Sequence, residues 1–391
     1  MLRKLRVVPS YFAIATSSWG RALVWSLIAA AFIGPGTVAT ATRAGAVGGY
    51  SYLPVVLLAA VAGYVFMEMA ARVTIVSERS LGELLRERGG GVLPVALYAA
   101  VCFGCAAYQA GNLLGAVGGL ALLLPTSSPY WVLVLAGGIA ALLWRGSTQS
   151  IARVMAFMVV GMGLLFVVGA LRIVIVGNDL VHAPLAVDTG ILLGLLGTTI
   201  VPYNFFLAAG LGSQSTLGDM RRGLGLSFGV GALITGCIVV VGGAAASFTS
   251  FADLSQILRD VLGTYGQLIL GVGLFAAGFS SATTAPLAAA VAGKELLGFA
   301  PDSRSFRATW LIVLLSGLTV ALTGWNTVGV IVVAQIVNGL LLPFIAAVVL
   351  VLANRRSLLG QRTNTWWQNL LGGGVLAFIF YKAGEFFLGL L

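Results

Sequence analysis

The sequence predicts an all-α membrane protein with many spans, and composition and hydropathy are the observations that predict it. Of its 391 residues, 59% are hydrophobic and 9% are charged, whereas a soluble domain carries roughly 25% charged residues. The mean hydropathy is +1.03, and apolar runs of about 20 residues recur along the chain. This composition excludes a soluble enzyme, a disordered chain and a nucleic-acid binder, and it predicts a lipid bilayer as the surroundings.

Charged and turn residues divide the apolar sequence into eleven expected spans. A short basic arm with Arg3, Lys4 and Arg6 precedes the first span without a small-residue cleavage site, so we expect an uncleaved cytoplasmic tail. The eleven spans are expected to begin near Ala22, Ser51, Val92, Tyr130, Ile151, Asp188, Leu224, Tyr265, Ala308, Thr327 and Trp366.

The distribution of Lys and Arg supports this topology. With the N-terminus inside, all but four of the 22 lysines and arginines fall on the inner side, as expected for cytoplasmic loops. We therefore expect a plasma (inner) membrane protein with a cytoplasmic N-terminus and an outer C-terminus. The net charge of +10 then follows from topology, and it predicts no nucleic-acid partner. The four outer basic residues are Arg43, Arg172, Arg259 and Lys382.

Two of the expected spans contain a helix-breaking segment. The first has Gly34-Pro35-Gly36-Thr37 at its middle, and the sixth has Pro202 between Thr198 and Asn204. Proline removes an N–H and clashes with the preceding turn, and such a break is tolerated at membrane depth only where it is buried or lines a cavity. Five spans separate the breaks, so the second unit is inverted, which is typical of a transporter substrate site. Two unrelated proline kinks are the alternative.

The first break belongs to a set of motifs spread along the chain: Gly34-Pro35-Gly36-Thr37-Val38-Ala39-Thr40, Ala44-Gly45, Ala70-Ala71-Arg72, Val76, Gly278-Phe279-Ser280-Ser281, Ala292-Gly293, Ala334-Gln335 and Leu342-Pro343-Phe344. Together these motifs are similar to those of the Nramp family, the natural resistance-associated macrophage proteins, which are proton-coupled divalent-metal transporters. The resemblance implies a LeuT-like fold, a 5+5 inverted repeat with an eleventh transmembrane helix, in a single transporter domain over 1–391. The first repeat is then expected at about 22–176, the second at about 188–352 and the extra helix at about 366–389.

The sequence departs from the family at the residues that bind metal. Gly34 and Thr37 stand where the resemblance implies Asp and Asn, and Val201 and Tyr203 stand where it implies Met and His. The third span lacks the family's acidic residues, with Gln109 near the expected place. A dehydrated divalent cation needs carboxylate or several strong oxygen donors. We therefore expect no metal site of the usual kind; any metal would bind near Thr37, Thr198 and Gln335.

Neutral polar residues surround both breaks instead. Hydroxyl and amide groups suit a neutral or zwitterionic solute, and half-helix N-termini could hold a carboxylate. Each Ser or Thr could equally be a packing residue bonded to its own helix. The sequence suggests no cofactor. The substrate-binding candidates are Gly34, Thr37, Thr198, Val201, Tyr203, Asn204, Ser281, Gln335 and Asn338.

Glu68 is the only acidic residue well inside an expected span. Intramembrane carboxylates are usually functional, so it is the candidate for proton coupling. An i,i+4 ion pair with Arg72 is an equally weighted structural interpretation. Arg43 is expected to snorkel or to guide anions. His182 is not expected to bind metal, and Cys102 and Cys105 are expected to be packing residues.

Three classes of function remain open. A secondary transporter with alternating access is favoured, with a neutral or zwitterionic small solute slightly preferred. The alternative substrate is a divalent metal cation held in an altered, hard-oxygen or partly hydrated site. A transporter-like receptor without flux is the second alternative. An enzyme is not expected, because the one His lies in a loop and no nucleotide-binding motif is present. The sequence does not indicate an oligomeric state.

Overall fold

The computed structural model confirms the all-α prediction. It describes residues 33–89, 91–124, 130–145, 149–176, 188–212, 215–245, 247–301 and 303–388, and these contain α-helices and short 3-10 turns but no strand. The predicted start of the first span at Ala22, the N-terminal arm and His182 lie outside the described residues.

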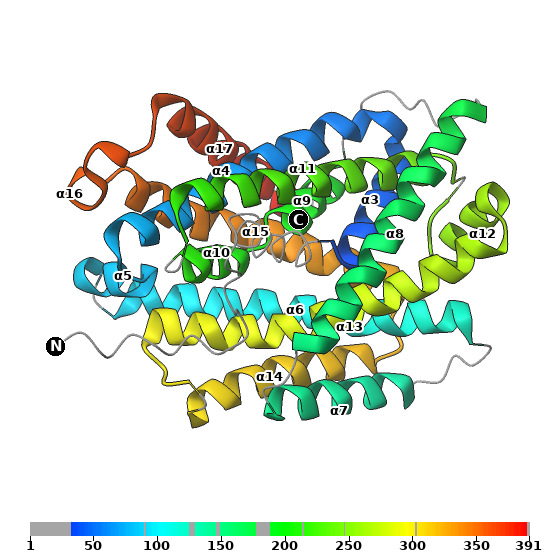
Figure 1. Cartoon of the computed structure of the whole chain (residues 1–391), viewed down its shortest axis with the longest axis horizontal. Coiled ribbons are helices and arrows are strands. Elements are labelled where there is room, and N and C mark those ends of the chain that lie inside the picture. The colour runs from blue at the N-terminus through cyan, green and yellow to red at the C-terminus, as the bar shows by residue number, and fades with distance from the viewer. Residues whose placement is uncertain are drawn as a thin grey trace.

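The described helices follow the order of the expected spans (Figure 1). The first half of the chain contains α3 (Pro35–Gly48), η2 (Gly49–Tyr52), α4 (Leu53–Ser77), α5 (Leu81–Gly89), α6 (Val92–Leu123), α7 (Tyr130–Arg145) and α8 (Gln149–Val176). The second half contains α9 (Thr189–Thr199), α10 (Asn204–Gly212), α11 (Leu217–Gly242), α12 (Phe251–Leu262), α13 (Thr264–Leu297), α14 (Arg304–Ala321) and α15 (Thr327–Ala353). The chain continues through α16 (Arg356–Leu359) and η3 (Gly360–Arg362) to α17 (Trp366–Leu388).

Eight helical stretches in the described residues are long and apolar enough to cross a membrane. This number is below the eleven expected spans for identifiable reasons. Only η2 separates α3 from α4, so the two form one stretch. Helix α7 is apolar but has 16 residues, and α14 begins with Arg304 and Arg307, which lower its hydropathy.

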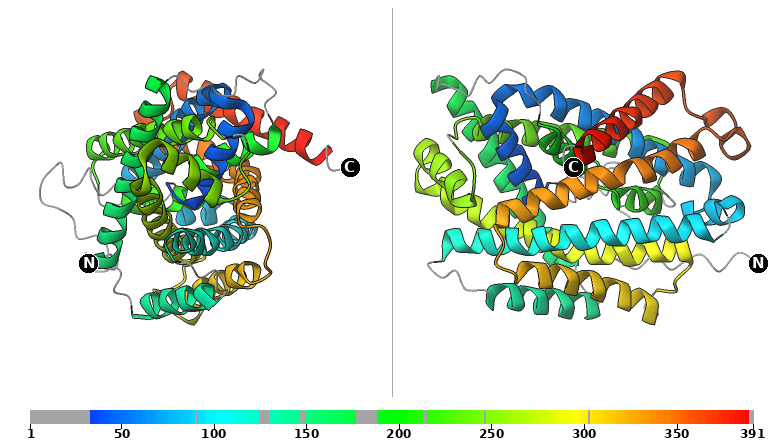
Figure 2. Two further views of the ribbon diagram at one scale, coloured as in Figure 1. Left: turned by 90° about the vertical axis from the view of Figure 1, so that its right-hand side faces the viewer. Right: turned by 180° about the vertical axis from the view of Figure 1, so that it is seen from behind.

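Packing between the helices recurs in the two halves of the chain. The contact of α3 with α11 corresponds to the contact of α10 with α4, in which the two halves have exchanged places. In the same way, the contact of α6 with α15 corresponds to that of α13 with α8. Helices α6 and α13 run alongside one another, with α7 and α14 on one side and the broken helices on the other (Figures 1 and 2). This is the expected inverted repeat, with α17 outside it. The residue boundaries proposed for the repeats stay a prediction.

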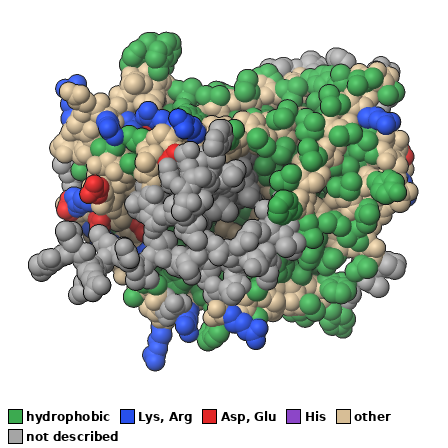
Figure 3. All heavy atoms as spheres, viewed as in Figure 1, with side chains coloured by type: hydrophobic (Ala, Val, Ile, Leu, Met, Phe, Trp, Pro, Cys, Tyr) green, Lys and Arg blue, Asp and Glu red, His purple; other side chains and the backbone are tan. Residues whose placement is uncertain are grey.

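The surface agrees with burial in a bilayer. Charged side chains are concentrated toward the end of the molecule where α5 and α16 lie, and hydrophobic side chains are numerous among the described residues of the opposite half of that face (Figure 3). Large apolar residues such as Phe157 and Ile175 are 78% and 80% exposed, as lipid-facing residues are. The charged end is the one that the sequence predicts to be cytoplasmic, and this orientation stays a prediction.

Both predicted breaks are helix boundaries in the structure. Helix α3 begins at Pro35 with Gly34 as its N-cap, a position where proline costs no hydrogen bond. Helix α9 ends at Thr199, and α10 begins at Asn204 after the segment that contains Pro202. Because Pro202 has no N–H, the carbonyl of Thr198 loses its usual helical donor.

Glycines allow the broken helices to approach their neighbours closely. A Cβ added to Gly197 of α9 would lie 2.0 Å from the carbonyl oxygen of Gln335, and one added to Gly339 of α15 would lie 2.3 Å from that of Leu193. These contacts involve backbone atoms, which cannot move aside as a side chain can. The α9–α15 crossing therefore requires glycine on both helices.

We expect Gly197→Ala to destabilise the protein. The added methyl group would overlap the α15 backbone, and overpacking of this kind costs about 1–3 kcal/mol. The matched control is Gly138→Ala on α7, where an added Cβ meets nothing within 4 Å and alanine improves helix propensity. Thermal unfolding in detergent should show a lower midpoint for Gly197→Ala alone. Equal midpoints for the two variants would contradict the packing argument.

Candidate functional site

The two helix breaks meet through their threonines. Thr37 Oγ1, in the first turn of α3, lies 2.8 Å from Thr198 Oγ1, in the last turn of α9, and either hydroxyl can be the donor. Both side chains are buried. The structure therefore brings together two predicted site residues that are 161 positions apart in the chain.

Helices α6 and α13 close another side of this site. A Cβ added to Gly34 would lie 3.1 Å from Ser281 Oγ and 3.8 Å from the Tyr108 hydroxyl. The Tyr108 ring packs edge-on against that of Tyr203, with ring centroids 6.0 Å apart. Gly34, Ser281 and Tyr203 are thus gathered near the break as expected. Tyr108 was not singled out by the sequence; its one signal is its place beside Gln109 in the span that lacks the expected acids.

Gln335 reaches the break from α15. Its carboxamide lies against Gly36, since a Cβ added there would be 2.2 Å from Gln335 Nε2. Gln335 is 1% exposed, and among the described residues its Oε1 has no hydrogen-bond partner. Asn338, one turn further on, lies against α6 instead, with its Oδ1 3.0 Å from a Cβ added to Gly104. The two amides therefore reach different neighbouring helices.

The segment between α9 and α10 supplies the remaining candidates. Val201 and Asn204 are fully buried, and the Val201 carbonyl accepts a hydrogen bond from the Asn204 N–H at 3.0 Å. In the described part of the chain, neither side-chain amide atom of Asn204 nor Ser281 Oγ has a partner. Leaving a buried polar atom unpaired costs about 1–3 kcal/mol, which contact with a polar ligand would offset. The break is thus lined by neutral groups able to bind one.

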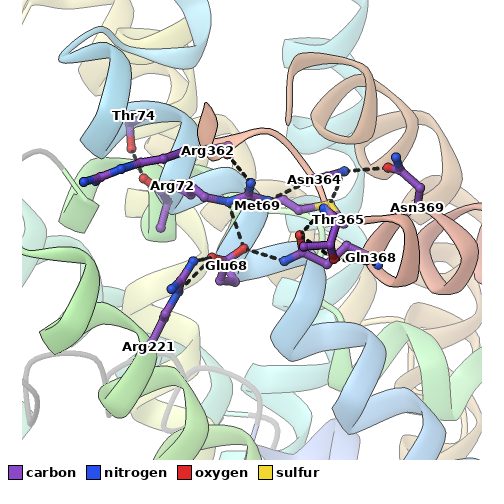
Figure 4. Close-up of polar contacts among 11 residues, drawn as sticks. Glu68, Met69, Arg72, Thr74, Arg221, Arg362, Asn364, Thr365, Gln368 and Asn369 are labelled. Atoms are coloured by element: carbon purple, nitrogen blue, oxygen red, sulfur yellow. Dashed lines mark hydrogen bonds and ion pairs between the residues drawn. The ribbon is translucent and has the colours of Figure 1, made fainter. Parts of the chain in front are cut away.

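Glu68 lies in a separate network, shown in Figure 4. Its carboxylate is 2% exposed. Oε2 accepts hydrogen bonds from Arg72 Nε at 3.1 Å and Gln368 Nε2 at 3.3 Å. Oε1 accepts from Arg221 Nε at 3.1 Å and Nη2 at 2.9 Å. The expected ion pair with Arg72 is present, whereas Arg221 and Gln368 are partners that sequence spacing did not indicate.

The same network continues to the segment before α17 (Figure 4). Arg72 donates to the backbone carbonyl of Arg362 and to Oδ1 of Asn364. Asn364 Nδ2 donates in turn to Asn369 Oδ1 at 2.8 Å. Glu68 and Arg72 therefore join α4 to α11 in the second half of the chain and to the start of the extra helix.

Arg43, Cys102 and Cys105 were also considered from the sequence. Arg43 is exposed and, with Ser247, Thr249 and Asn326, lines a cavity of about 440 Å³. Cys102 and Cys105 are free thiols, and Cys105 is buried. Among the residues that the structure describes, no group of three or more His, Cys, Asp or Glu side chains could hold a metal ion.

Comparison with known proteins gives matches over most of the chain. The chain is 26% identical over 365 residues to the divalent metal cation transporter MntH of Acidiphilium cryptum, covering 87% of this chain and 83% of that protein. It is also 25% identical over 406 residues to the metal transporter Nramp6 of Arabidopsis thaliana, covering 92% of this chain and 76% of that protein.

Solved structures show the same fold. The manganese transporter of Eremococcus coleocola superposes with a TM-score of 0.76 at 19% identity, covering 94% of this chain and 87% of that one. MhsT, solved in complex with L-phenylalanine, superposes with a TM-score of 0.62. The family model described as natural resistance-associated macrophage protein-like matches residues 26–388. Because that match spans nearly the whole chain, this protein belongs to the Nramp family.

Proposed function

We propose that this protein is a secondary transporter of divalent metal cations. Its substrate site is proposed to lie where the start of α3 meets the end of α9. The observation that carries the proposal is the meeting of the buried Thr37 and Thr198 hydroxyls at 2.8 Å, with the Gln335 carboxamide packed against Gly36, the residue before Thr37. Curated relatives named as divalent metal cation transporters support a cation as substrate. The sequence-based preference for a neutral or zwitterionic solute is not supported by these comparisons, which favour the alternative.

A site without carboxylate can hold a divalent cation if the cation keeps part of its hydration shell. Thr37 and Thr198 offer hydroxyl oxygens, Gln335 offers Oε1, and Pro202 leaves the Thr198 carbonyl without its helical donor. The C-terminal end of α9 adds the negative end of a helix dipole, and transporter sites use such ends to bind cations. Water molecules that stay on the ion would complete its coordination.

The same donors set the expected selectivity. Oxygen ligands suit hard ions such as Mg²⁺ and Mn²⁺, whereas thioether and thiolate ligands favour soft ions. Val201 stands in the α9–α10 segment where the resemblance implies a methionine, so no sulfur faces the proposed site from there. Gly34 also supplies no carboxylate. We therefore propose weak, hard-ion binding with little affinity for Cd²⁺.

The driving force is proposed to be the membrane potential. A divalent cation crossing with no counter-charge gains about 4.6 kcal/mol per 100 mV, since each charge contributes about 2.3 kcal/mol. Glu68 is the coupling candidate, but its two oxygens accept hydrogen bonds from two arginines and a glutamine. We propose that the carboxylate is a structural link between α4, α11 and α17. The proposed mechanism is alternating access of the site without a proton carrier.

Cation flux into proteoliposomes tests the proposed substrate. We expect uptake of Mn²⁺ or Mg²⁺ and little uptake of Cd²⁺ at equal concentration. Thr37→Val keeps the side-chain shape and removes the hydroxyl, so it should raise the KM for the carried ion about tenfold, as for one lost oxygen contact. The matched control is Thr319→Val on α14, an exposed residue whose hydroxyl donates to the Leu315 carbonyl of its own helix. Uptake of a neutral amino acid in place of every divalent ion would contradict the proposal.

Glu68→Gln tests the assignment of Glu68. We expect wild-type uptake to be nearly independent of an imposed pH gradient and the variant to be less stable. Removing one partner of a buried ion pair costs about 3–5 kcal/mol, and less here because the Arg221 side chain is 53% exposed. Glu87→Gln is the matched control, since its ion pair with Arg79 is exposed and exposed pairs contribute little. Strong pH-driven uptake that disappears in a folded Glu68→Gln variant would identify Glu68 as a proton carrier instead.

A further inference from the structure

Gly36 occupies a position where α3 presents no side chain to α15. A Cβ added there would lie 2.2 Å from Gln335 Nε2, 2.7 Å from its Cδ and 3.2 Å from its Oε1. Real Cβ atoms essentially never approach another heavy atom closer than 3.0 Å. The carboxamide of Gln335 therefore fills the space that a side chain at position 36 would need.

The backbone of α15 cannot retreat from this contact. Gly197 of α9 packs against the Gln335 carbonyl and the Gly339 N–H, at 2.0 and 2.5 Å from an added Cβ. Leu193 closes on Gly339 in the same way. With its main chain held on α9, Gln335 can respond to a larger residue at position 36 only by turning its side chain away.

The direction of that side chain matters for the break. Gly36 directly precedes Thr37, whose hydroxyl bonds to Thr198. Gln335 is 1% exposed, and its Oε1 has no partner among the described residues. The Gln335 carboxamide is therefore buried against the residue that precedes Thr37, and its oxygen is free to accept a contact from a ligand.

We infer that Gly36 is a positioning residue of the substrate site. It leaves a socket that holds the Gln335 carboxamide at the break, where its oxygen binds a hard divalent cation or one of the cation's waters. Gly36 does not touch the substrate and acts only through Gln335. This inference rests on the proposed cation transport. It adds Gly36 as the residue that determines where the Gln335 carboxamide oxygen lies.

The test is a double-mutant cycle between the two positions, read as Mn²⁺ uptake into proteoliposomes, or Mg²⁺ uptake if that is the ion carried. Gly36→Ala should raise KM about tenfold with little change in maximal rate, because the donor is displaced while the moving helices are intact. The overlap involves only the end of a flexible side chain, so the variant should fold, which thermal unfolding checks. Gly229→Ala on α11, where an added Cβ meets nothing within 4 Å, is the matched control.

The second half of the cycle shortens Gln335 to asparagine, alone and together with Gly36→Ala. Gln335→Asn alone should raise KM, because its carboxamide ends one methylene short of the socket. In Gly36→Ala/Gln335→Asn the shorter side chain does not reach the new methyl group, so the second change should add nothing and KM should stay within about threefold of that of Gln335→Asn alone. Wild-type behaviour of Gly36→Ala, or a double variant as impaired as the sum of the two single changes, would overturn the inference.

A structure of the Gly36→Ala variant separates this inference from the proposed function. A turned Gln335 side chain on an unmoved α15 backbone supports the positioning role even if the wild type carries no divalent cation, a result that would refute only the proposed function. An unmoved Gln335 carboxamide, with α3 displaced instead, would refute the positioning role whatever the substrate.

Discussion

A hydrogen bond between two threonine hydroxyls joins the broken helices, and the arrangement of the candidate site depends on it. Thr37 and Thr198 meet because the start of α3 lies against the end of α9. Each break leaves backbone groups without helical partners, and a bilayer offers no water to satisfy them. The breaks must therefore be enclosed by protein. Helices α6 and α15 pack on the broken helices through glycine contacts at Gly115 and Gly339, and α13 packs on α6 through Gly278.

The structure separates its charges from its candidate site. The described side chains at the break are hydroxyls, amides and aromatic rings, whereas Glu68, Arg72 and Arg221 form their own network near the expected cytoplasmic end. A buried carboxylate surrounded by two arginines contributes mainly by fixing the relative positions of the helices it joins, here α4, α11 and the segment before α17. A neutral break favours an ion that brings part of its own water over one that must be fully coordinated by the protein.

Much of this arrangement could be predicted from the sequence, because it depends on local chemistry. Pro35 and Pro202 mark the breaks, and apolar runs mark the helices. What the sequence missed are contacts between distant positions: Arg221 and Gln368 lie 153 and 300 residues from Glu68. Gln335 and Asn338 share a helix face by spacing, yet only Gln335 has a described contact at the break, since the neighbouring helices decide which space each amide fills. The preference for a neutral solute failed to find support because hydroxyls and amides suit a partly hydrated cation equally well.

The most direct test of the account is the reversal potential of divalent-cation flux in proteoliposomes that contain the purified protein. A fixed Mn²⁺ or Mg²⁺ gradient is opposed by a potassium diffusion potential, and the potential at which net flux stops is measured with and without a pH gradient. The account predicts a reversal potential set by the cation gradient alone, for two charges moved per ion, and unchanged by the pH gradient. A reversal potential that shifts with the pH gradient would contradict uncoupled transport, and an absence of any divalent-cation flux would contradict the assignment of the neutral break as a cation site.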